Sequence, residues 1–176
     1  MTRYIAFLRG INVSGQKLIK MEELRKHFEI PGFKNVVTYI QSGNVLFDAK
    51  ETDTTKLRAK IEKQLAAKLG YEVAVIVRSI DEIKQAIKRN PYPNADEDTE
   101  RKLYVTFLSD TPDKALHASL DKYKNENEEF RILEREVYLL LVSYGNTKLS
   151  NALIEKKLGL CATTRNWATL NKILEL

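Results

Sequence analysis

The chain of 176 residues contains one cysteine and two histidines, and it has no long uninterrupted hydrophobic run. A single cysteine, Cys161, excludes an internal disulfide, and with His27 and His117 it offers too few ligands for a zinc site. The N-terminus lacks the apolar stretch of a signal peptide, and no run reaches membrane-spanning length. We therefore expect a cytoplasmic protein that does not enter a membrane, and we assign it no metal and no cofactor.

The chain also lacks a large excess of either charge. The 29 basic and 24 acidic residues give a formal net charge of +5, and 43% of the residues are hydrophobic. These are values of a folded chain, and the length suits one sizeable domain or two small, closely packed ones. The small positive excess eases the approach of anionic partners but is mild for a nucleic-acid binder. Composition therefore permits anionic partners and disfavours nucleic-acid binding.

The first half of the chain alternates strand and helix patterns. Short runs of apolar and β-branched residues predict strands at residues 4–8, 36–40, 45–47 and 73–77. Leucine and isoleucine recur at helical spacing over residues 57–69, and Thr54 or Thr55 is the expected cap of that helix. Ser79 and Glu82 form a capping box for a further helix. Met21, Leu24 and Phe28 recur at helical spacing after the first strand, so the order is β-α-β-β-α-β with a trailing helix, that of the ferredoxin-like arrangement.

The second half repeats this order. Strands are predicted at residues 103–108, 131–133, 137–142 and 160–163. Thr111-Pro112 is expected to open a helix between the first two of these strands, with Leu116 and Leu120 on its apolar side. In both halves the last strand ends in an arginine followed by a helix cap, as Arg78-Ser79 and as Arg165-Asn166. We interpret the correspondence as a degenerate internal duplication.

The predicted fold is therefore α+β, a tandem duplication of two ferredoxin-like halves with antiparallel sheets and helices on one face of each sheet. We expect the halves at residues 1–90 and 102–176, joined by an acidic, proline-containing linker at residues 91–101. Each half is close to the size at which a lone core is marginal. The halves should therefore pack together, with an intertwined arrangement left open.

A glycine pair follows the first predicted strand. The spacing from Gly10 to Gly15 is that of a phosphate-binding loop, which also follows a strand. However, Gln16 stands where that motif has its lysine, Lys17 falls one place late, and the residue after this lysine is Leu18 instead of the hydroxyl that would hold magnesium. The stretch is therefore retained only as a candidate anion site.

Polar residues gather where predicted strands meet loops. The candidate ligand-binding residues are Arg9, Asn12, Gln41, Ser42, Asn44 and Arg165. Antiparallel pairing of the first and third strands would bring Arg9 toward the turn at residues 41–44, so that a guanidinium and several amides could meet an anionic ligand. The competing interpretation is local, because serine and asparagine also suit turns and helix caps. Both interpretations remain open at this stage.

No catalytic group can be assigned from the sequence. No base for nucleophilic catalysis is evident beside His27, His117 or Cys161; the histidines are interpreted as ordinary surface or packed residues, and Cys161 as a small buried apolar residue in a strand. An RNA-binding sheet is disfavoured as well, because Tyr4 and Phe7 should point to opposite faces of the first strand. The leading hypothesis is a binding module for a small anionic ligand. The alternatives are an enzyme of unrecognised type using the same polar loop site, and a protein-interaction or assembly module or weak RNA binder.

Four stretches carry a family resemblance, namely LRGINV at 8–13, TYIQSGNVLF at 38–47, NPY at 90–92 and EKKLGLCATTRNW at 155–167. They closely resemble the uncharacterised bacterial family catalogued as domain of unknown function 1697. Ser14 departs from the family pattern, which usually has a second glycine there. The resemblance implies two ferredoxin-like halves and implies no activity, because none is established for the family.

Overall fold

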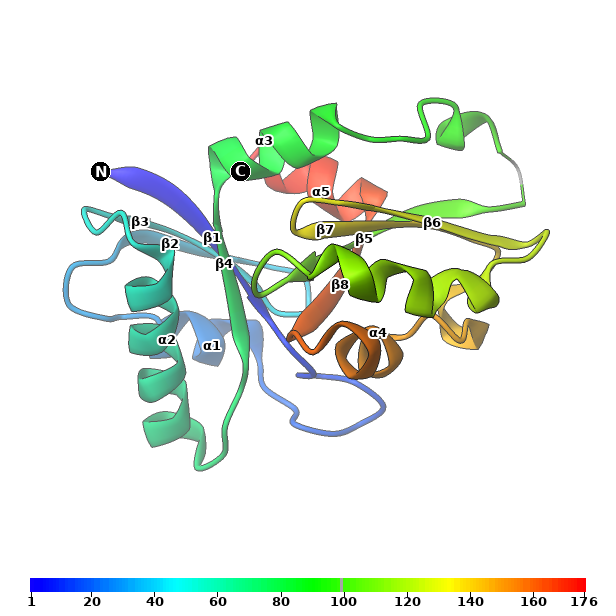
Figure 1. Cartoon of the computed structure of the whole chain (residues 1–176). Helices are drawn as coiled ribbons and strands as arrows, with labels where there is room; N and C mark the ends of the chain where they lie inside the picture. The colour runs from blue at the N-terminus through cyan, green and yellow to red at the C-terminus, as the bar shows by residue number, and fades with distance from the viewer. Residues whose placement is uncertain (99) are drawn as a thin grey trace. The chain divides into compact units, whose positions relative to one another are not determined.

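The computed structural model describes residues 1–98 and 100–176 and contains two compact units. The first unit comprises residues 1–83 with Leu176, and the second comprises residues 84–175. Each unit contains one four-stranded antiparallel sheet with packed helices (Figure 1). The predicted α+β class is thereby confirmed, with two sheets of ferredoxin-like strand order. Among the described residues, no helix combines the length and apolarity needed to cross a bilayer.

The sheet of the first unit has the strand order β2-β3-β1-β4. Its strands are β1 (Thr2–Leu8), β2 (Lys34–Tyr39), β3 (Asn44–Ala49) and β4 (Val75–Ser79). All neighbouring pairs are antiparallel, and Phe7 at the end of β1 pairs with Asn44 at the start of β3. The central pairing of β1 with β3 is the one that the sequence predicted.

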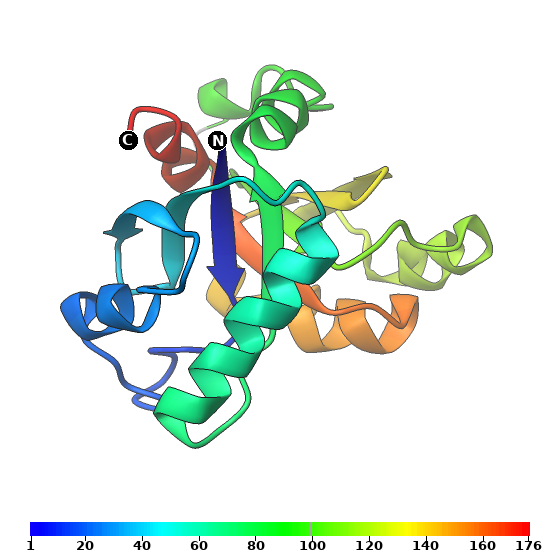
Figure 2. The same cartoon turned by 90° about the vertical axis from the view of Figure 1, so that its left-hand side faces the viewer.

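Two helices cover one face of this sheet, α1 (Met21–His27) and α2 (Thr54–Leu69). Figure 2 shows α2 lying over the sheet. The core beneath them contains an aromatic group around Phe47, whose ring centroid lies 4.2 Å from that of Phe33 and 5.7 Å from that of Tyr4. Leu57 and Ile61 of α2 are fully buried against the same cluster. The period-3.6 stripe in the sequence therefore marks the face that α2 buries.

Helix capping agrees with the sequence at one position and corrects it at another. The main-chain N–H of Ser79 donates to Glu82, and the N–H of Glu82 donates to the Ser79 hydroxyl, which confirms the capping box at the start of α3 (Ile80–Lys88). The expected cap of α2 at Thr54 or Thr55 is wrong. Asp53 fills this role instead, because its carboxylate accepts a 2.9 Å hydrogen bond from the main chain of Thr55.

The second unit repeats the strand order as β6-β7-β5-β8. Its strands are β5 (Lys102–Leu108), β6 (Glu128–Leu133), β7 (Glu136–Leu141) and β8 (Ala162–Asn166). Its helical elements are the 3₁₀ helices η1 (Ala95–Glu97), η2 (Lys114–Tyr123) and η3 (Tyr144–Asn146) and the α-helices α4 (Asn151–Leu158) and α5 (Trp167–Ile173). Asn166 caps α5 as the sequence indicated, accepting from the main chain of Thr169 at 2.7 Å.

The helix expected to open at Thr111-Pro112 begins later than predicted. The segment is the 3₁₀ helix η2, which begins at Lys114 because the Asp113 carboxylate accepts from the N–H of Ala115 at 2.9 Å. Leu120 of η2 is fully buried in the core of the second unit. The predicted apolar side is therefore buried only in part, because Leu116 is 39% exposed in this helix, which is wound more tightly than an α-helix.

Equivalent hydrogen bonds recur in the two units. In the first, the Glu62 carboxylate of α2 accepts from the N–H of Val75 at the start of β4. In the second, the Glu155 carboxylate of α4 accepts from the N–H of Ala162 at the start of β8. Each glutamate thus fastens a helix to the strand that follows it. This repetition is consistent with duplicated halves.

Tyr138 of β7 gives the second unit a testable pH dependence. Its ring is fully buried, and its hydroxyl donates to the carbonyl oxygen of Ala86 in α3 at 2.6 Å. Burial raises the pKa of Tyr138 to about 12. An unfolded tyrosine ionises near pH 10, so the stability contributed by the neutral side chain is present below about pH 10 and is lost as the pH rises toward 12.

We expect Tyr138→Phe to lower the free energy of unfolding by about 1 kcal/mol at pH 7, because one buried hydrogen bond is removed. The variant should also lose less stability than the parent protein between pH 10 and pH 12. Urea unfolding of both proteins across this range measures the effect, and subtracting the two curves cancels the contributions of other titrating groups. If the difference in unfolding free energy between the two proteins is the same at all pH values, Tyr138 has the same pKa in the folded and unfolded states.

Candidate functional site

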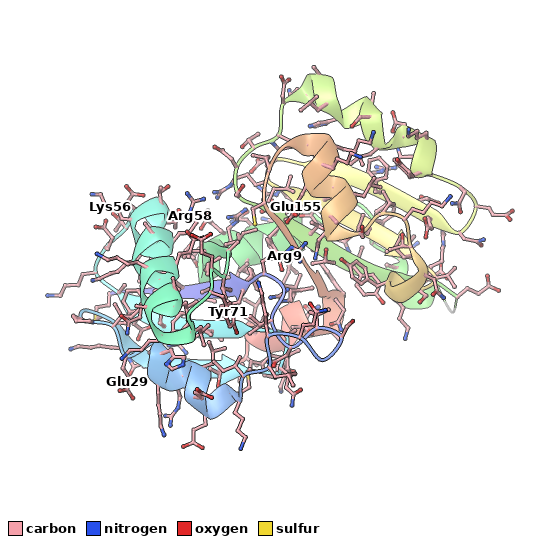
Figure 3. The ribbon with its side chains drawn as sticks, turned by 90° about the horizontal axis from the view of Figure 1, so that it is seen from below. Arg9, Glu29, Lys56, Arg58, Tyr71 and Glu155 are labelled. Atoms are coloured by element: carbon pink, nitrogen blue, oxygen red, sulfur yellow. The ribbon has the colours of Figure 1, made fainter. Side chains whose placement is uncertain are left out.

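The first loop and the β2–β3 turn meet at one end of the sheet in the first unit. The main-chain N–H of Leu8 donates to the carbonyl oxygen of Gly43 at 2.9 Å. The Asn12 side-chain amide donates to the carbonyl oxygen of Gln41, also at 2.9 Å. Arg9, labelled in Figure 3, follows β1 directly, and its N–H donates to the carbonyl oxygen of Ala74. The candidate residues of this unit therefore occupy neighbouring segments.

Asn12 holds the first loop together. Its side-chain oxygen accepts from the N–H of Ile19 at 2.8 Å, and its side-chain nitrogen donates to the carbonyl oxygen of Ile19 at 3.1 Å. The Asn12 backbone is left-handed, with φ of 51°, a conformation that asparagine tolerates better than most residues. Through these contacts Asn12 stabilises its own loop, as the interpretation that competed with ligand binding expected.

Asn44 has a similar local role in the turn. Its side chain is fully buried and donates to the carbonyl oxygen of Tyr39 at 2.9 Å and to the Ser42 hydroxyl at 3.0 Å. The side chains of Ile11 and Leu8 pack directly beside Gly43. Gln41 and Ser42 are exposed, Arg9 and Asn12 are half-buried, and Asn44 is buried.

Arg165 belongs to the second unit and is only 6% exposed. Its guanidinium donates to the Thr163 hydroxyl and to the carbonyl oxygen of Thr164, each at 2.8 Å. Burial lowers the pKa of Arg165 to about 10, so the side chain remains charged at neutral pH. The position predicted as a ligand contact is thus a buried cation in β8.

The aromatic residues of β1 are buried in the sheet. Tyr4 is 2% exposed and Phe7 is fully buried. Tyr4 belongs to the core cluster beneath α1 and α2, and its hydroxyl donates to the carbonyl oxygen of Glu51. Neither ring is accessible for stacking on a nucleic-acid base.

A basic pocket that the sequence analysis did not identify lies elsewhere in the first unit. It has a volume of about 460 Å³. We call it the lysine pocket; its lining residues are Met1, Pro31, Gly32, Phe33, Lys34, Ala49, Lys50, Glu51, Lys56, Leu57 and Lys60. They come from the N-terminal residue, the α1–β2 turn with the start of β2, the end of β3 with the two residues after it, and the first two turns of α2, where Figure 3 labels Lys56.

Lys60 is held in a defined position in the lysine pocket. Its ammonium donates to the carbonyl oxygen of Pro31 at 2.8 Å and lies 5.8 Å from the centroid of the Phe33 ring. The Phe33 ring in turn stacks on Phe47 at 4.2 Å with an interplanar angle of 14°. A lysine ammonium has three donors, so Lys60 retains donors for an acceptor in the pocket.

The pocket carries more positive than negative charge. Four lysines line it against one carboxylate, Glu51. The N–H groups of Asp53 and Thr52 donate to Glu51, and the bond from Asp53 is the main cause that lowers the pKa of this carboxyl. The Lys56 ammonium lies 3.9 Å from the Glu51 carboxylate. The remaining lysine charge makes the pocket attractive to an anion.

The sequence gives little indication of this pocket. Lys34 lies in β2, Lys50 follows β3, and Lys56 and Lys60 lie one turn apart on α2. Only the last pair has a spacing that places two lysines on one helix face. The register of β2 with β3 and the packing of α2 bring the four together, and no local motif encodes either.

Comparison with known proteins agrees with this architecture. The conserved bacterial protein SP0830 from Streptococcus pneumoniae has a similar structure, with a TM-score of 0.74 and 24% sequence identity over 99% of this chain and 97% of that protein. At this identity the likeness concerns the fold alone. A comparison with curated proteins found no match. The family model described as protein of unknown function (DUF1697) matches residues 1–138, and the chain belongs to this family.

Proposed function

We propose that the protein binds a small anionic ligand and that the lysine pocket of the first unit holds it. The observation that carries this proposal is a pocket of about 460 Å³ lined by four lysines and one carboxylate. Small-molecule sites usually have volumes of about 300–1,000 Å³ and combine apolar walls with a few placed polar groups. The lysine pocket fits this description, with Phe33 and Leu57 among its apolar walls.

The position of the Lys60 ammonium supports a role in anion binding over that of an ordinary surface lysine. Its hydrogen bond to Pro31 and its placement near the Phe33 ring reduce the number of conformations that the side chain can adopt. A preordered cation loses less entropy when it meets a ligand. We therefore assign Lys60 as the principal anion contact, with Lys56 on the same side of α2 as a second.

The loop at residues 9–12 and the turn at residues 41–44 remain the alternative location for the ligand. Gln41 and Ser42 are exposed there, beside the half-buried Arg9. A ligand bound at this surface would depend on Arg9 and not on Lys60. The two locations are thus distinguished by one variant at each.

Binding can be measured by calorimetry with orthophosphate, citrate, nucleotides and carboxylates as probes. We expect at least one of these anions to bind, and Lys60→Gln to weaken its affinity about tenfold or more, because one charge-assisted hydrogen bond is lost. The matched control is Lys63→Gln, which removes an exposed lysine of α2 outside the pocket lining. This control should leave the affinity within about twofold, the range expected for a remote surface charge.

Three results would contradict the proposed site or function. If Lys63→Gln weakens binding as much as Lys60→Gln does, the anion responds to overall charge rather than to the pocket. If Arg9→Ala abolishes binding while Lys60→Gln does not, the ligand occupies the loop surface. If none of the probes binds in low-salt buffer, the proposed function is wrong.

A further inference from the structure

We infer that the ligand of the lysine pocket is an amphiphilic anion, a molecule with an apolar chain or ring that ends in a carboxylate or phosphate. This inference rests on the proposed function and specifies its substrate class. Its basis is the separation of chemistry within the pocket, where apolar side chains form the walls and lysines supply the charge.

The apolar part of the pocket is continuous with the core of the first unit. Leu57 and Ala49 line it and also belong to the buried cluster, with exposed fractions of 1% and 2%. Phe33 is half-buried, and its stacking on Phe47 holds the ring in place. These walls are rigid because the packed core supports them from behind.

Apolar surface also extends toward solvent around these walls. Pro31 is exposed, and Met1 is 58% exposed. A compact hydrated anion would leave this surface in contact with water. An apolar tail would cover it, and removing apolar surface from water is favourable.

The charged part of the pocket lies on flexible stems. Lys56 has 70% of its side chain exposed, and Lys34, Lys50 and Lys60 are also exposed. Lysine stems are apolar, so they can lie along the walls while their ammonium groups stay in water. A ligand with its tail against Phe33 and Leu57 would therefore present its anionic end to Lys60.

The size of the pocket agrees with a small amphiphile. A volume of about 460 Å³ exceeds what a single phosphate or carboxylate group needs. A second hollow of about 490 Å³ shares Pro31, Gly32, Phe33 and Lys34 with the pocket. It adds Arg25, Glu29 and Asn35 together with the apolar Ile30 and Val36, so Val36 is a further half-buried apolar contact for a longer tail.

A homologous series of ligands tests the inference. We would measure calorimetric dissociation constants for butanoate, hexanoate and octanoate, with octyl phosphate, octanol and inorganic phosphate as comparisons, all below their aggregation concentrations. Each added methylene should tighten binding about fourfold until the walls are covered. Octanol should bind at least about tenfold more weakly than octanoate, because it lacks the charged end. Octanoate should bind with a stoichiometry of one per chain.

Two variants separate the contribution of the head from that of the tail. Lys60→Gln should weaken all carboxylates by the same factor and leave the gain per methylene unchanged. Phe33→Leu should reduce the gain per methylene, because part of the wall is removed. Unchanged far-UV circular dichroism checks that both variants fold, and Lys63→Gln again serves as the control.

Each alternative outcome has a distinct meaning. If inorganic phosphate or butanoate binds as tightly as octanoate, the amphiphile inference is wrong and the proposed anion-binding function stands. If octanol equals octanoate, the pocket is merely apolar and the proposed function fails as well. Binding of many octanoate molecules per chain would indicate a detergent-like effect and overturn the inference, and absence of binding by all probes would overturn both proposals.

Discussion

Replacing Phe47 by alanine is expected to lower the free energy of unfolding of the first unit by about 4 kcal/mol. Phe47 is fully buried at the centre of β3, and its ring contacts the rings of Tyr4, Phe28 and Phe33. Truncation would remove these contacts and leave a cavity that the strands on either side cannot close. These ring contacts link β3 to β1, to the residue that follows α1 and to the α1–β2 turn.

The loss is measured by urea unfolding followed by far-UV circular dichroism, together with hydrogen exchange of the β1 and β3 amides. Phe47→Leu is the matched control, since it keeps most of the apolar volume and should cost clearly less. A loss below about 1 kcal/mol for the alanine variant would show that the aromatic group is not central to the core.

Gly43→Ala should destabilise the first unit by about 3 kcal/mol. Gly43 has φ of +82°, and an added Cβ would lie 2.8 Å from Cδ1 of Ile11 and 2.9 Å from Cβ of Leu8. Both neighbours are almost completely buried, so neither can move aside without disturbing the core. The substitution therefore combines an unfavourable backbone conformation with a steric clash.

Gly10→Ala is the control that separates these two effects. Gly10 also has a left-handed backbone, with φ of +71°, but an added Cβ would meet no atom within 4 Å. We expect a loss of about 1 kcal/mol, the cost of the backbone conformation alone. Thermal or urea unfolding of both variants provides the comparison, and equal losses would mean that the contact of Gly43 with Ile11 and Leu8 is looser than the structure indicates.

Local patterns in the sequence predict most of the fold. The alternation of apolar runs fixes the order of strands and helices, and the capping box at Ser79 and the cap at Asn166 mark two helix starts correctly. Such features depend on residues that are close in the chain. The cap at Asp53 could have been predicted in the same way, since aspartate is as good a capping residue as the threonines that follow it.

The candidate site could be predicted only in part. Pairing of β1 with β3 brings Asn12 and the turn at residues 41–44 together, and strand order alone predicts this neighbourhood. The sequence does not predict that Asn44 is fully buried or that the Asn12 amide bonds to Ile19, because both depend on side-chain packing. For the same reason the sequence predicts that Arg165 lies at the end of a strand but does not predict that its side chain is buried.

The lysine pocket illustrates a second limit. Its lysines come from separate elements of the chain. In the sequence they look the same as exposed lysines outside the pocket, such as Lys63. What distinguishes Lys60 is the position of its ammonium near Pro31 and Phe33. This position follows from the packing of α2 against the turn at residues 31–33, a long-range feature that no short motif records.

The central claim is that an anionic ligand occupies the lysine pocket, and chemical-shift mapping with octanoate tests it most directly. Amide spectra of the ¹⁵N-labelled full chain would be recorded during a titration at low and at high salt. The account predicts that the largest saturable shifts occur at residues 32–34, 49–51 and 56–60, and that Lys60→Gln raises the octanoate concentration needed for half-saturation about tenfold. Saturable shifts centred on residues 9–12 and 41–44, or shifts spread over exposed lysines such as Lys63, would contradict it.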